Sequence, residues 1–220
     1  FSCGWGICTM NMDGTGTHKL TSDSLVADDP AWSPNGEQLA FAVSFEGDWE
    51  ICTMKADGTG LTHLTYSPGR DEHPCWSPDG SRIAFVSERD GNRELYVMNA
   101  DGTESANLTN HSDGDEKPSW SPDGADMLTH GVGWESPIGG ALHVHNRLYG
   151  VWAVDTLNGQ VHSMPQPIDT YPGLVGWQDD QHYLYCDDDL LRSVDVISGE
   201  ETEVIRCCCY NEISQSTENG

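Results

Sequence analysis

Basic residues are scarce in this sequence. Its 220 residues include 10 Lys and Arg against 36 Asp and Glu, which gives a formal net charge of −26. A surface with this charge repels DNA, RNA and acidic membranes. The composition therefore excludes nucleic-acid binding and favours a heavily solvated, soluble surface, with binding of a cation such as calcium as the alternative explanation of the acidic excess.

Long apolar runs are missing as well. No stretch approaches the roughly 20 apolar residues that a membrane-spanning helix needs, and no signal peptide is present. Helical periodicity, phosphate-binding loops, nucleophile elbows and the paired-cysteine spacing of zinc sites are also absent from the sequence. These absences exclude most familiar catalytic motifs, so the sequence favours a protein that is not an enzyme.

What the sequence does contain is a repeat. The pattern Pro-x-Trp-Ser-Pro-Asp/Asn-Gly occurs three times, and its tryptophans, Trp32, Trp76 and Trp120, are 44 residues apart. A fixed period of this length indicates one supersecondary unit per copy. Alternating apolar residues and Asp-Gly turns divide each unit into four short strands, which we name A to D in chain order.

The units continue beyond the three clear copies, because a strand followed by a turn ending in glycine occurs five times in all. We therefore predict an all-β fold: a single β-propeller domain over residues 1–220, with five blades of four-stranded antiparallel sheets. Four of the predicted blades span residues 27–66, 67–110, 111–165 and 166–206. The first blade combines residues 1–26 with residues 207–220, so that the N- and C-terminal strands close the ring and protect its sheet edges.

The third copy carries the fullest form of the repeat. It reads DEHPCWSPDG over residues 71–80, IAFVSERDG over 83–91 and YVMNADGT over 96–103. These phrases closely resemble the TolB-type β-propeller repeat, also called WD40-like or PD40, strongly over residues 7–124 and more weakly over residues 125–206. The resemblance implies four-stranded sheets around a central channel, with strand A innermost.

The resemblance does not fix an activity. TolB itself binds periplasmic and outer-membrane proteins, whereas similar propellers gate peptidases or carry polysaccharide lyase sites. A fold shared by such different proteins leaves the function to be argued from individual sites.

Three aspartates mark one end of the expected channel. Asp71, Asp115 and Asp169 each stand three residues before a proline, at the start of an innermost strand. A ring of these carboxylates could bind a cation or a basic group of a partner, which makes them candidate binding residues. The alternative, which we favour, is that each Asp caps its own loop by accepting backbone N–H bonds.

The fourth unit carries an insertion, mostly within residues 131–150. It contains three candidate binding residues, Trp134, His143 and His145, followed by Arg147. In an extended segment the two imidazoles project to the same side, which suits metal binding or acid–base chemistry. With Arg147 to neutralise a sugar acid, His143 and His145 form the candidate site of a carbohydrate-active enzyme. The alternative is that this His-x-His pair is solvated or serves packing.

Eight cysteines indicate an oxidising compartment. The run Cys207, Cys208 and Cys209 should pass towards the first blade, so we expect one of these residues to bond Cys3 or Cys8 and lock the ring. The sequons that begin at Asn107 and Asn110 are candidate glycosylation sites. We therefore expect a secreted protein, either extracellular or periplasmic.

These observations favour a secreted, non-enzymatic propeller that serves as a binding or scaffold module for a protein or glycan partner. Two alternatives remain open. The chain could be a carbohydrate-active lyase or hydrolase of the propeller type, or a structural subunit of an extracellular assembly in which propellers associate with one another. Calcium is the one cofactor that the composition suggests.

Overall fold

The structure is a computed structural model of the chain, and it describes residues 1–110, 114–132, 149–157, 161–162, 173–187, 190–196 and 198–206. Every regular element in these ranges is a β-strand, and the strands pair antiparallel in five sheets. The predicted all-β fold is therefore confirmed. No helix in the same ranges is long and apolar enough to cross a membrane.

The first sheet has three strands. β1 (Ser2–Cys3) pairs with β2 (Gly6–Thr9), which in turn pairs with β3 (His18–Lys19). These strands correspond to B, C and D of the repeat. The part of the chain that the structure describes provides no innermost strand for this sheet. The tail predicted to supply that strand, residues 207–220, lies outside the described ranges.

The second and third sheets are four-stranded and repeat each other. The second consists of β4 (Ala27–Trp32), β5 (Gln38–Phe45), β6 (Asp48–Lys55) and β7 (Thr62–His63). The third consists of β8 (Asp71–Trp76), β9 (Arg82–Ser87), β10 (Glu94–Asn99) and β11 (Ala106–Asn107). In both sheets the strands follow one another in chain order, from strand A to strand D.

The fourth and fifth sheets keep the same topology. The fourth consists of β12 (Gly114–Trp120), β13 (Asp126–Val132), β14 (Tyr149–Asp155) and β15 (Val161–His162). The fifth consists of β16 (Gly173–Trp177), β17 (His182–Asp187), β18 (Leu190–Asp195) and β19 (Glu201–Arg206). Because β13 and β14 pair as far as Val132 and Tyr149, most of the expected insertion falls on residues 133–148, outside the described ranges.

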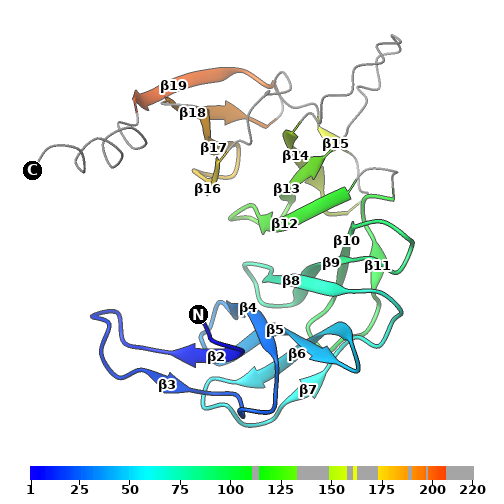
Figure 1. Cartoon of the computed structure of the whole chain (residues 1–220). Coiled ribbons are helices and arrows are strands. Elements are labelled where there is room, and N and C mark those ends of the chain that lie inside the picture. Colours follow the sequence, from blue (N-terminus) through cyan, green and yellow to red (C-terminus); the bar gives the residue numbers. More distant parts are fainter. Residues whose placement is uncertain are drawn as a thin grey trace, which may run out of the picture.

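The five sheets lie around a common centre in chain order, as Figure 1 shows, with the first and fifth sheets at opposite ends of the array. β4, β8, β12 and β16 are the A strands on the inner side, and each contacts the next. Neighbouring sheets therefore pack face to face around a hub, which is the propeller arrangement.

Apolar side chains fill the junctions between neighbouring sheets. Two of the tryptophans at these junctions are hydrogen-bonded to the preceding A strand. Trp120 Nε1 donates a hydrogen bond to the carbonyl of Cys75 at 3.1 Å, and Trp177 Nε1 donates one to the carbonyl of Ser119 at 2.9 Å. The indole thus adds a directional bond to the apolar area that it buries.

The exposure of the tryptophans depends on the preceding sheet. Trp76 and Trp120 are only 8% and 7% exposed, which confirms that they pack between blades. Trp32 was expected to do the same, but it is 48% exposed. The reason is that its neighbour is the first sheet, where the described residues include no A strand to cover the indole.

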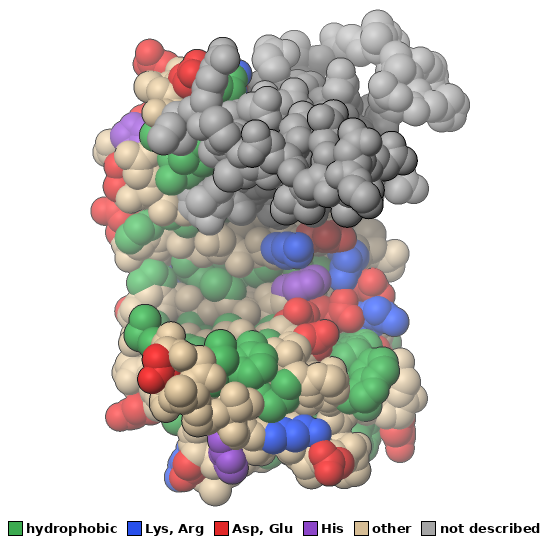
Figure 2. All heavy atoms as spheres, turned by 60° about the vertical axis from the view of Figure 1, so that its left-hand side comes forward, with side chains coloured by type: hydrophobic (Ala, Val, Ile, Leu, Met, Phe, Trp, Pro, Cys, Tyr) green, Lys and Arg blue, Asp and Glu red, His purple; other side chains and the backbone are tan. Residues whose placement is uncertain are grey.

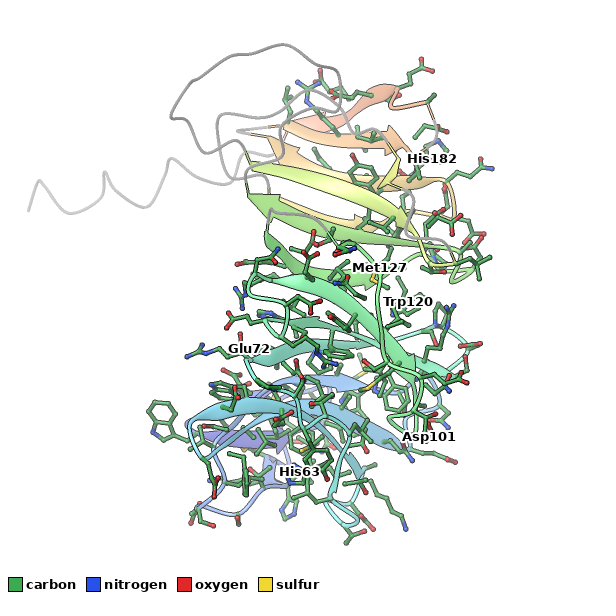
Figure 3. All side chains as sticks on the ribbon, turned by 90° about the vertical axis from the view of Figure 1, so that its right-hand side faces the viewer. His63, Glu72, Asp101, Trp120, Met127 and His182 are labelled. Carbon is green, nitrogen blue, oxygen red and sulfur yellow. A yellow bond between two sulfur atoms is a disulfide. The ribbon has the colours of Figure 1, made fainter. Side chains whose placement is uncertain are left out.

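The turns define two faces of the molecule. In the Ser-Pro-Asp-Gly turn, Asp79 Oδ1 accepts the Ser77 hydroxyl at 2.6 Å and the backbone N–H of Ser81 at 3.0 Å. These bonds, led by the Ser77 hydroxyl, lower the pKa of Asp79 to about 2. We call the side with these turns the turn face, and the opposite side, where the A strands begin, the mouth face. Figure 3 shows Asp101 on the turn face and Glu72 on the mouth face.

Candidate functional site at the mouth face

Each A strand of the second to fourth sheets carries a bulge. The pairing of β4, β8 and β12 with the next strand is interrupted at corresponding places. There φ is 52° at Asp29, 54° at His73 and 52° at Lys117, each directly before a proline. A bulge re-aims the side chain that it carries. Corresponding positions of three neighbouring blades thus present an acid, an imidazole and an ammonium group.

Two of these side chains meet across the junction of the second and third sheets. Asp29 Oδ2 lies 3.6 Å from His73 Nε2 and accepts the backbone N–H of His73 at 3.4 Å. Lys117, in the next blade, is exposed. The bulges therefore support a charged row whose members differ from blade to blade.

Arg93 joins the third and fourth sheets. Its Nη1 donates to Glu116 Oε1 and its Nη2 donates to Glu72 Oε2, both at 2.7 Å. Its Nε lies 3.7 Å from Glu88 Oε1, and Arg70 Nη1 donates to Glu72 Oε1 at 3.3 Å. We call these five residues the Arg93 cluster. Charge-assisted bonds of this length are among the stronger polar contacts in proteins, so the cluster fixes its side chains in place.

The Arg93 cluster is accessible. The side chain of Arg70 is 54% exposed, and those of Arg93 and Glu116 are 29% and 31% exposed. Figure 2 shows acidic, basic and histidine side chains gathered next to one another in the middle of the molecule. A binding partner can therefore reach charges of both signs here.

Asp71 lies behind this surface and is completely buried. Its Oδ2 accepts hydrogen bonds from Arg89 Nη2 and the Ser67 hydroxyl, both at 3.0 Å. Its Oδ1 makes no hydrogen bond of normal geometry, although the Ser87 and Thr65 hydroxyls are near enough to lower the pKa. Burial outweighs these contacts and raises the pKa of Asp71 above its usual range.

Asp115 is also completely buried, and the Thr129 hydroxyl donates to its Oδ1 at 3.5 Å. Asp169 lies outside the described ranges. The hydrogen-bond donors to Asp71 are side chains, rather than the loop N–H groups that we favoured. The carboxylates of the Arg93 cluster differ in exposure: the side chains of Glu88 and Glu116 are 37% and 31% exposed, and that of Glu72 is 12% exposed. A binding role for Asp71, Asp115 and Asp169 stays a prediction.

The insertion candidates Trp134, His143, His145 and Arg147 lie outside the described ranges, so their binding and catalytic roles stay predictions. Among the residues that the structure does describe, no group of three or more His, Cys, Asp or Glu side chains could hold a metal ion. Binding of the calcium that the composition suggests stays a prediction.

The disulfide differs from the expected one. Cys3 and Cys8 bond each other, with their Cα atoms 5.8 Å apart. The expected bond from one of them to Cys207, Cys208 or Cys209 is therefore wrong, and those three residues lie outside the described ranges. The reason is local: β1 and β2 form a tight hairpin that brings Cys3 and Cys8 together, and a short loop costs less entropy to close than a chain-long one.

The two sequons differ in accessibility. Asn107 is half-buried, and its Nδ2, the atom that a glycan would modify, donates to Asp90 Oδ2 at 2.9 Å. Asn110 is exposed. Glycosylation of both stays a prediction, and the structure favours Asn110 as the acceptor.

Sequence reasoning missed the Arg93 cluster, although one signal was present. Trp5, Trp49 and Arg93 stand at the same position of three successive repeats, so an arginine replaces an aromatic residue there. The repeat alone could not show that Glu116, on the next blade, lies within reach of that arginine. Contacts between blades depend on the angle between sheets, which the sequence pattern does not specify.

Comparisons with solved structures show the same fold. A TolB protein from Acinetobacter baumannii is 21% identical, with a TM-score of 0.64 over 90% of this chain and 48% of that one. A protein assigned to TolB from Agrobacterium tumefaciens is 25% identical, with a TM-score of 0.56 over 67% of this chain and 52% of that one. The chain thus spans about half the length of these relatives.

An oligogalacturonate lyase from Vibrio parahaemolyticus is similar in fold as well. It is 15% identical, with a TM-score of 0.65 over 89% of this chain and 58% of that one. No curated protein matches the sequence. The TolB β-propeller domain family, however, matches residues 7–133, more than half of the chain. With its repeats, its sheets around a hub and this match, the chain belongs to the TolB β-propeller family.

Proposed function

We propose that this chain is a non-enzymatic binding module that takes a protein partner at the mouth face, over the Arg93 cluster and Lys117. The observation that carries the proposal is the cluster itself. Arg93 links two blades through Glu72, which is largely buried, and Glu116, which is 31% exposed, in a chain that has only 10 basic residues. Three of these ten, Arg70, Arg93 and Lys117, gather on this surface.

Charges of both signs suit recognition of a protein. Complementary charges across an interface fix its register and reject wrong partners, and they contribute more to specificity than to raw affinity. The bulged backbone and the bonds of Arg93 hold these groups in place before binding, which reduces the entropy that a partner must overcome. A protein segment with its own alternating charges matches this surface better than a uniformly charged polymer does.

The proposed location is outside the cytosol, in the periplasm or the extracellular space. The Cys3–Cys8 disulfide supports it, because such bonds persist in oxidising compartments. The family match supports the periplasm in particular, since the resemblance to TolB implies that compartment.

A glycan partner, a lyase activity and self-assembly are the competing functions. The first two depend on Trp134, His143, His145 and Arg147, which lie outside the described ranges. The similarity to oligogalacturonate lyase concerns the fold alone, at 15% identity. The protein-binding function is preferred because the Arg93 cluster and Lys117 present fixed charges of both signs on an accessible surface.

Two matched variants test the proposal. Lys117→Asp reverses a charge at the mouth and introduces the residue that Asp29 already provides at the same bulge. Lys55→Asn removes a charge from the turn face and introduces the residue found at Asn99. Partners captured by the wild-type chain from periplasmic or secreted extracts are identified and purified, and their affinities are then measured by titration calorimetry.

We expect Lys117→Asp to lower the affinity for a partner by about tenfold, roughly 1.4 kcal/mol, because an attraction between charges becomes a repulsion. Lys55→Asn should leave the affinity unchanged. The proposed surface is contradicted if a partner binds Lys117→Asp as tightly as the wild type. It is also contradicted if Lys55→Asn abolishes binding. In parallel, turnover of any member of a polysaccharide panel by the wild-type chain would contradict a non-enzymatic role.

A further inference from the structure

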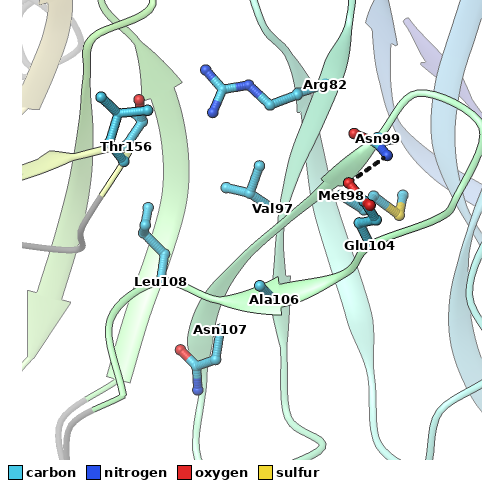
Figure 4. A pocket seen from close by; sticks show the side chains of 10 residues that line it. Arg82, Val97, Met98, Asn99, Glu104, Ala106, Asn107, Leu108 and Thr156 are labelled. Carbon is cyan, nitrogen blue, oxygen red and sulfur yellow. Dashed lines mark hydrogen bonds between the residues drawn. The ribbon is translucent and has the colours of Figure 1, made fainter.

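A pocket of about 340 Å³ opens between the third and fourth sheets. Its lining is mixed. Val97, Ala106, Leu108 and Leu157 contribute apolar surface, Asn99, Asn107 and Thr156 contribute polar groups, and Arg82 and Glu104 are charged. Figure 4 shows Arg82 and Glu104 on separate sides of the opening. The volume lies within the range of small-molecule sites. The pocket is distinct from the Arg93 cluster and shares no residue with it.

The pocket has a structural origin. In the first and second junctions, a turn glycine sits tightly on the preceding blade: a Cβ added at Gly58 would lie 3.1 Å from the carbonyl oxygen of Leu20, and one at Gly102 would lie 3.1 Å from that of Leu64. The turns that carry these glycines span eight residues, 54–61 and 98–105, between paired strand positions. The corresponding turn of the fourth sheet spans six, 155–160. The fourth sheet thus has two residues fewer between its paired positions, at the junction where the pocket lies.

Arg82 forms no ion pair within the part of the chain that the structure describes, which is unusual in so acidic a protein. The other described arginine side chains each lie within 4.0 Å of a carboxylate: Arg70, Arg89, Arg93 and Arg192. Arg82 instead stacks over the Trp120 ring, 4.7 Å from its centroid, and donates one long bond of 3.5 Å to the carbonyl of Gly124. Its guanidinium is therefore held in place while donors remain for an anionic group.

Glu104 occupies a position that the repeat otherwise gives to glycine. Its φ is 55°, and the corresponding residues Gly16 and Gly60 have φ of 66° and 72°. A non-glycine residue in this left-handed region is strained, and such strain is concentrated at functional sites. Glu104 accepts a hydrogen bond from Asn99 Nδ2 at 3.2 Å, and it forms no ion pair with Arg82. The pocket thus contains two opposite charges that do not neutralise each other.

We propose that this pocket binds a small zwitterion with an apolar side chain, of the amino-acid or short-peptide class. Its carboxylate pairs with Arg82, its ammonium group pairs with Glu104, and its side chain covers Val97 and Leu108. A bidentate pair with a stacked arginine and a charge-assisted bond to a carboxylate supply orientation, and burial of the ligand's side chain against Val97 and Leu108 adds to the affinity.

The test compares four probes by titration calorimetry at about pH 6.5, where α-amino groups are protonated. L-leucine and leucyl-leucine are zwitterions of two lengths, N-acetyl-leucine lacks the cation, and leucine amide lacks the anion. We expect at least one zwitterion to bind about tenfold more tightly than both blocked probes, because each charge contributes a charge-assisted bond.

Two variants assign the charges. Arg82→Gln introduces the residue that Gln38 provides at the same position of the second sheet, and Glu104→Gln keeps the shape of the side chain. Arg82→Gln should lower the affinity for the zwitterion to that for leucine amide, and Glu104→Gln should lower it to that for N-acetyl-leucine. Lys19→Gln, in the first sheet, should leave it unchanged.

Several results would overturn the proposal. They are a lack of binding of either zwitterion at about 10 mM, a blocked probe that binds as tightly as the zwitterions, or full affinity in either charge variant. If Arg82→Gln does not fold, the affinity of Glu104→Gln for the zwitterion still tests the proposal, because this variant changes only one exposed charge and should fold.

Discussion

The buried ion pair of Asp71 and Arg89 lies within the third blade and tests how that blade is held together. Asp71 is completely buried, and the Arg89 side chain is 20% exposed. Arg89 also stacks over the Tyr96 ring, 4.3 Å from its centroid. The perturbation is Arg89→Phe, which removes the charge but keeps an aromatic group, and which introduces the residue found at Phe45 in the preceding blade.

Arg89→Phe leaves a buried carboxylate without its ionic partner. Removal of one partner of a buried pair typically costs 3–5 kcal/mol. We expect about 3 kcal/mol, at the lower end, because Arg89 is partly solvated and the Ser67 hydroxyl still donates to Asp71. The midpoint of urea unfolding, followed by tryptophan fluorescence, should fall accordingly at an unchanged slope.

The second sheet has apolar residues at the positions of this ion pair. β4 and β5 pair Ala27 with Val43 where β8 and β9 pair Asp71 with Ser87. The triple variant Asp71→Ala, Ser87→Val, Arg89→Phe therefore introduces the three residues that the second sheet has at the equivalent positions. Replacing a buried ion pair by apolar groups is often neutral, so we expect the triple variant to lie within about 1 kcal/mol of the wild type.

Acidification provides the internal check on this account. Burial raises the pKa of Asp71 in the folded chain above the ordinary value of 3.8. A carboxyl group with a raised folded pKa takes up a proton on folding, so its destabilising effect is complete above the folded pKa and decreases as pH falls towards 3.8. The loss in Arg89→Phe should therefore shrink on acidification. A triple variant as unstable as Arg89→Phe, or a loss that does not depend on pH, would refute the reasoning.

Three further outcomes are expected. Asp79 has a pKa of about 2, so the stability that it contributes is lost as pH falls from about 4 to 2. Asp79→Asn introduces the residue found at Asn35 in the preceding blade. In urea titrations this variant should lack the part of the stability that depends on acid pH. Trp120→Phe removes the bond to the Cys75 carbonyl and should cost about 2 kcal/mol in the same assay. Burial raises the pKa of the Cys52 thiol to about 12, so peptide mapping should find it unalkylated at pH 8 in the folded chain and alkylated after unfolding.

The fold could be predicted because the repeat specifies it several times over. Trp76 and Trp120, with the Ser-Pro-Asp-Gly turns beside them, mark the end of an A strand at a fixed interval, and the structure places those A strands side by side. A strand that is ambiguous in one copy of the repeat can be assigned from the equivalent residues of the other copies. Where a feature occurs only once, as in the Cys3–Cys8 hairpin, no second copy constrained the interpretation, and the expected pairing was wrong.

The candidate site could be predicted only in part. The position of Asp71 at the start of an A strand follows from the proline pattern, but its burial depends on Arg89, which covers it from the turn after the neighbouring strand. The contact of Arg93 with Glu116 depends on the packing of two blades. Patterns in sequence fix the strand on which a residue lies, whereas the packing angle between sheets decides which residues meet.

The differences between copies separate structural from functional residues. All three bulges require the same positive φ, yet they carry Asp29, His73 and Lys117. A backbone strain that recurs with different side chains is imposed by the fold, so these side chains are available for binding. At Glu104 the opposite holds: the backbone favours glycine, as at Gly60, and a side chain is present nonetheless. Function is therefore most strongly indicated where a copy departs from the residue that the fold prefers, and by that criterion the pocket of Arg82 and Glu104 ranks beside the mouth of the channel.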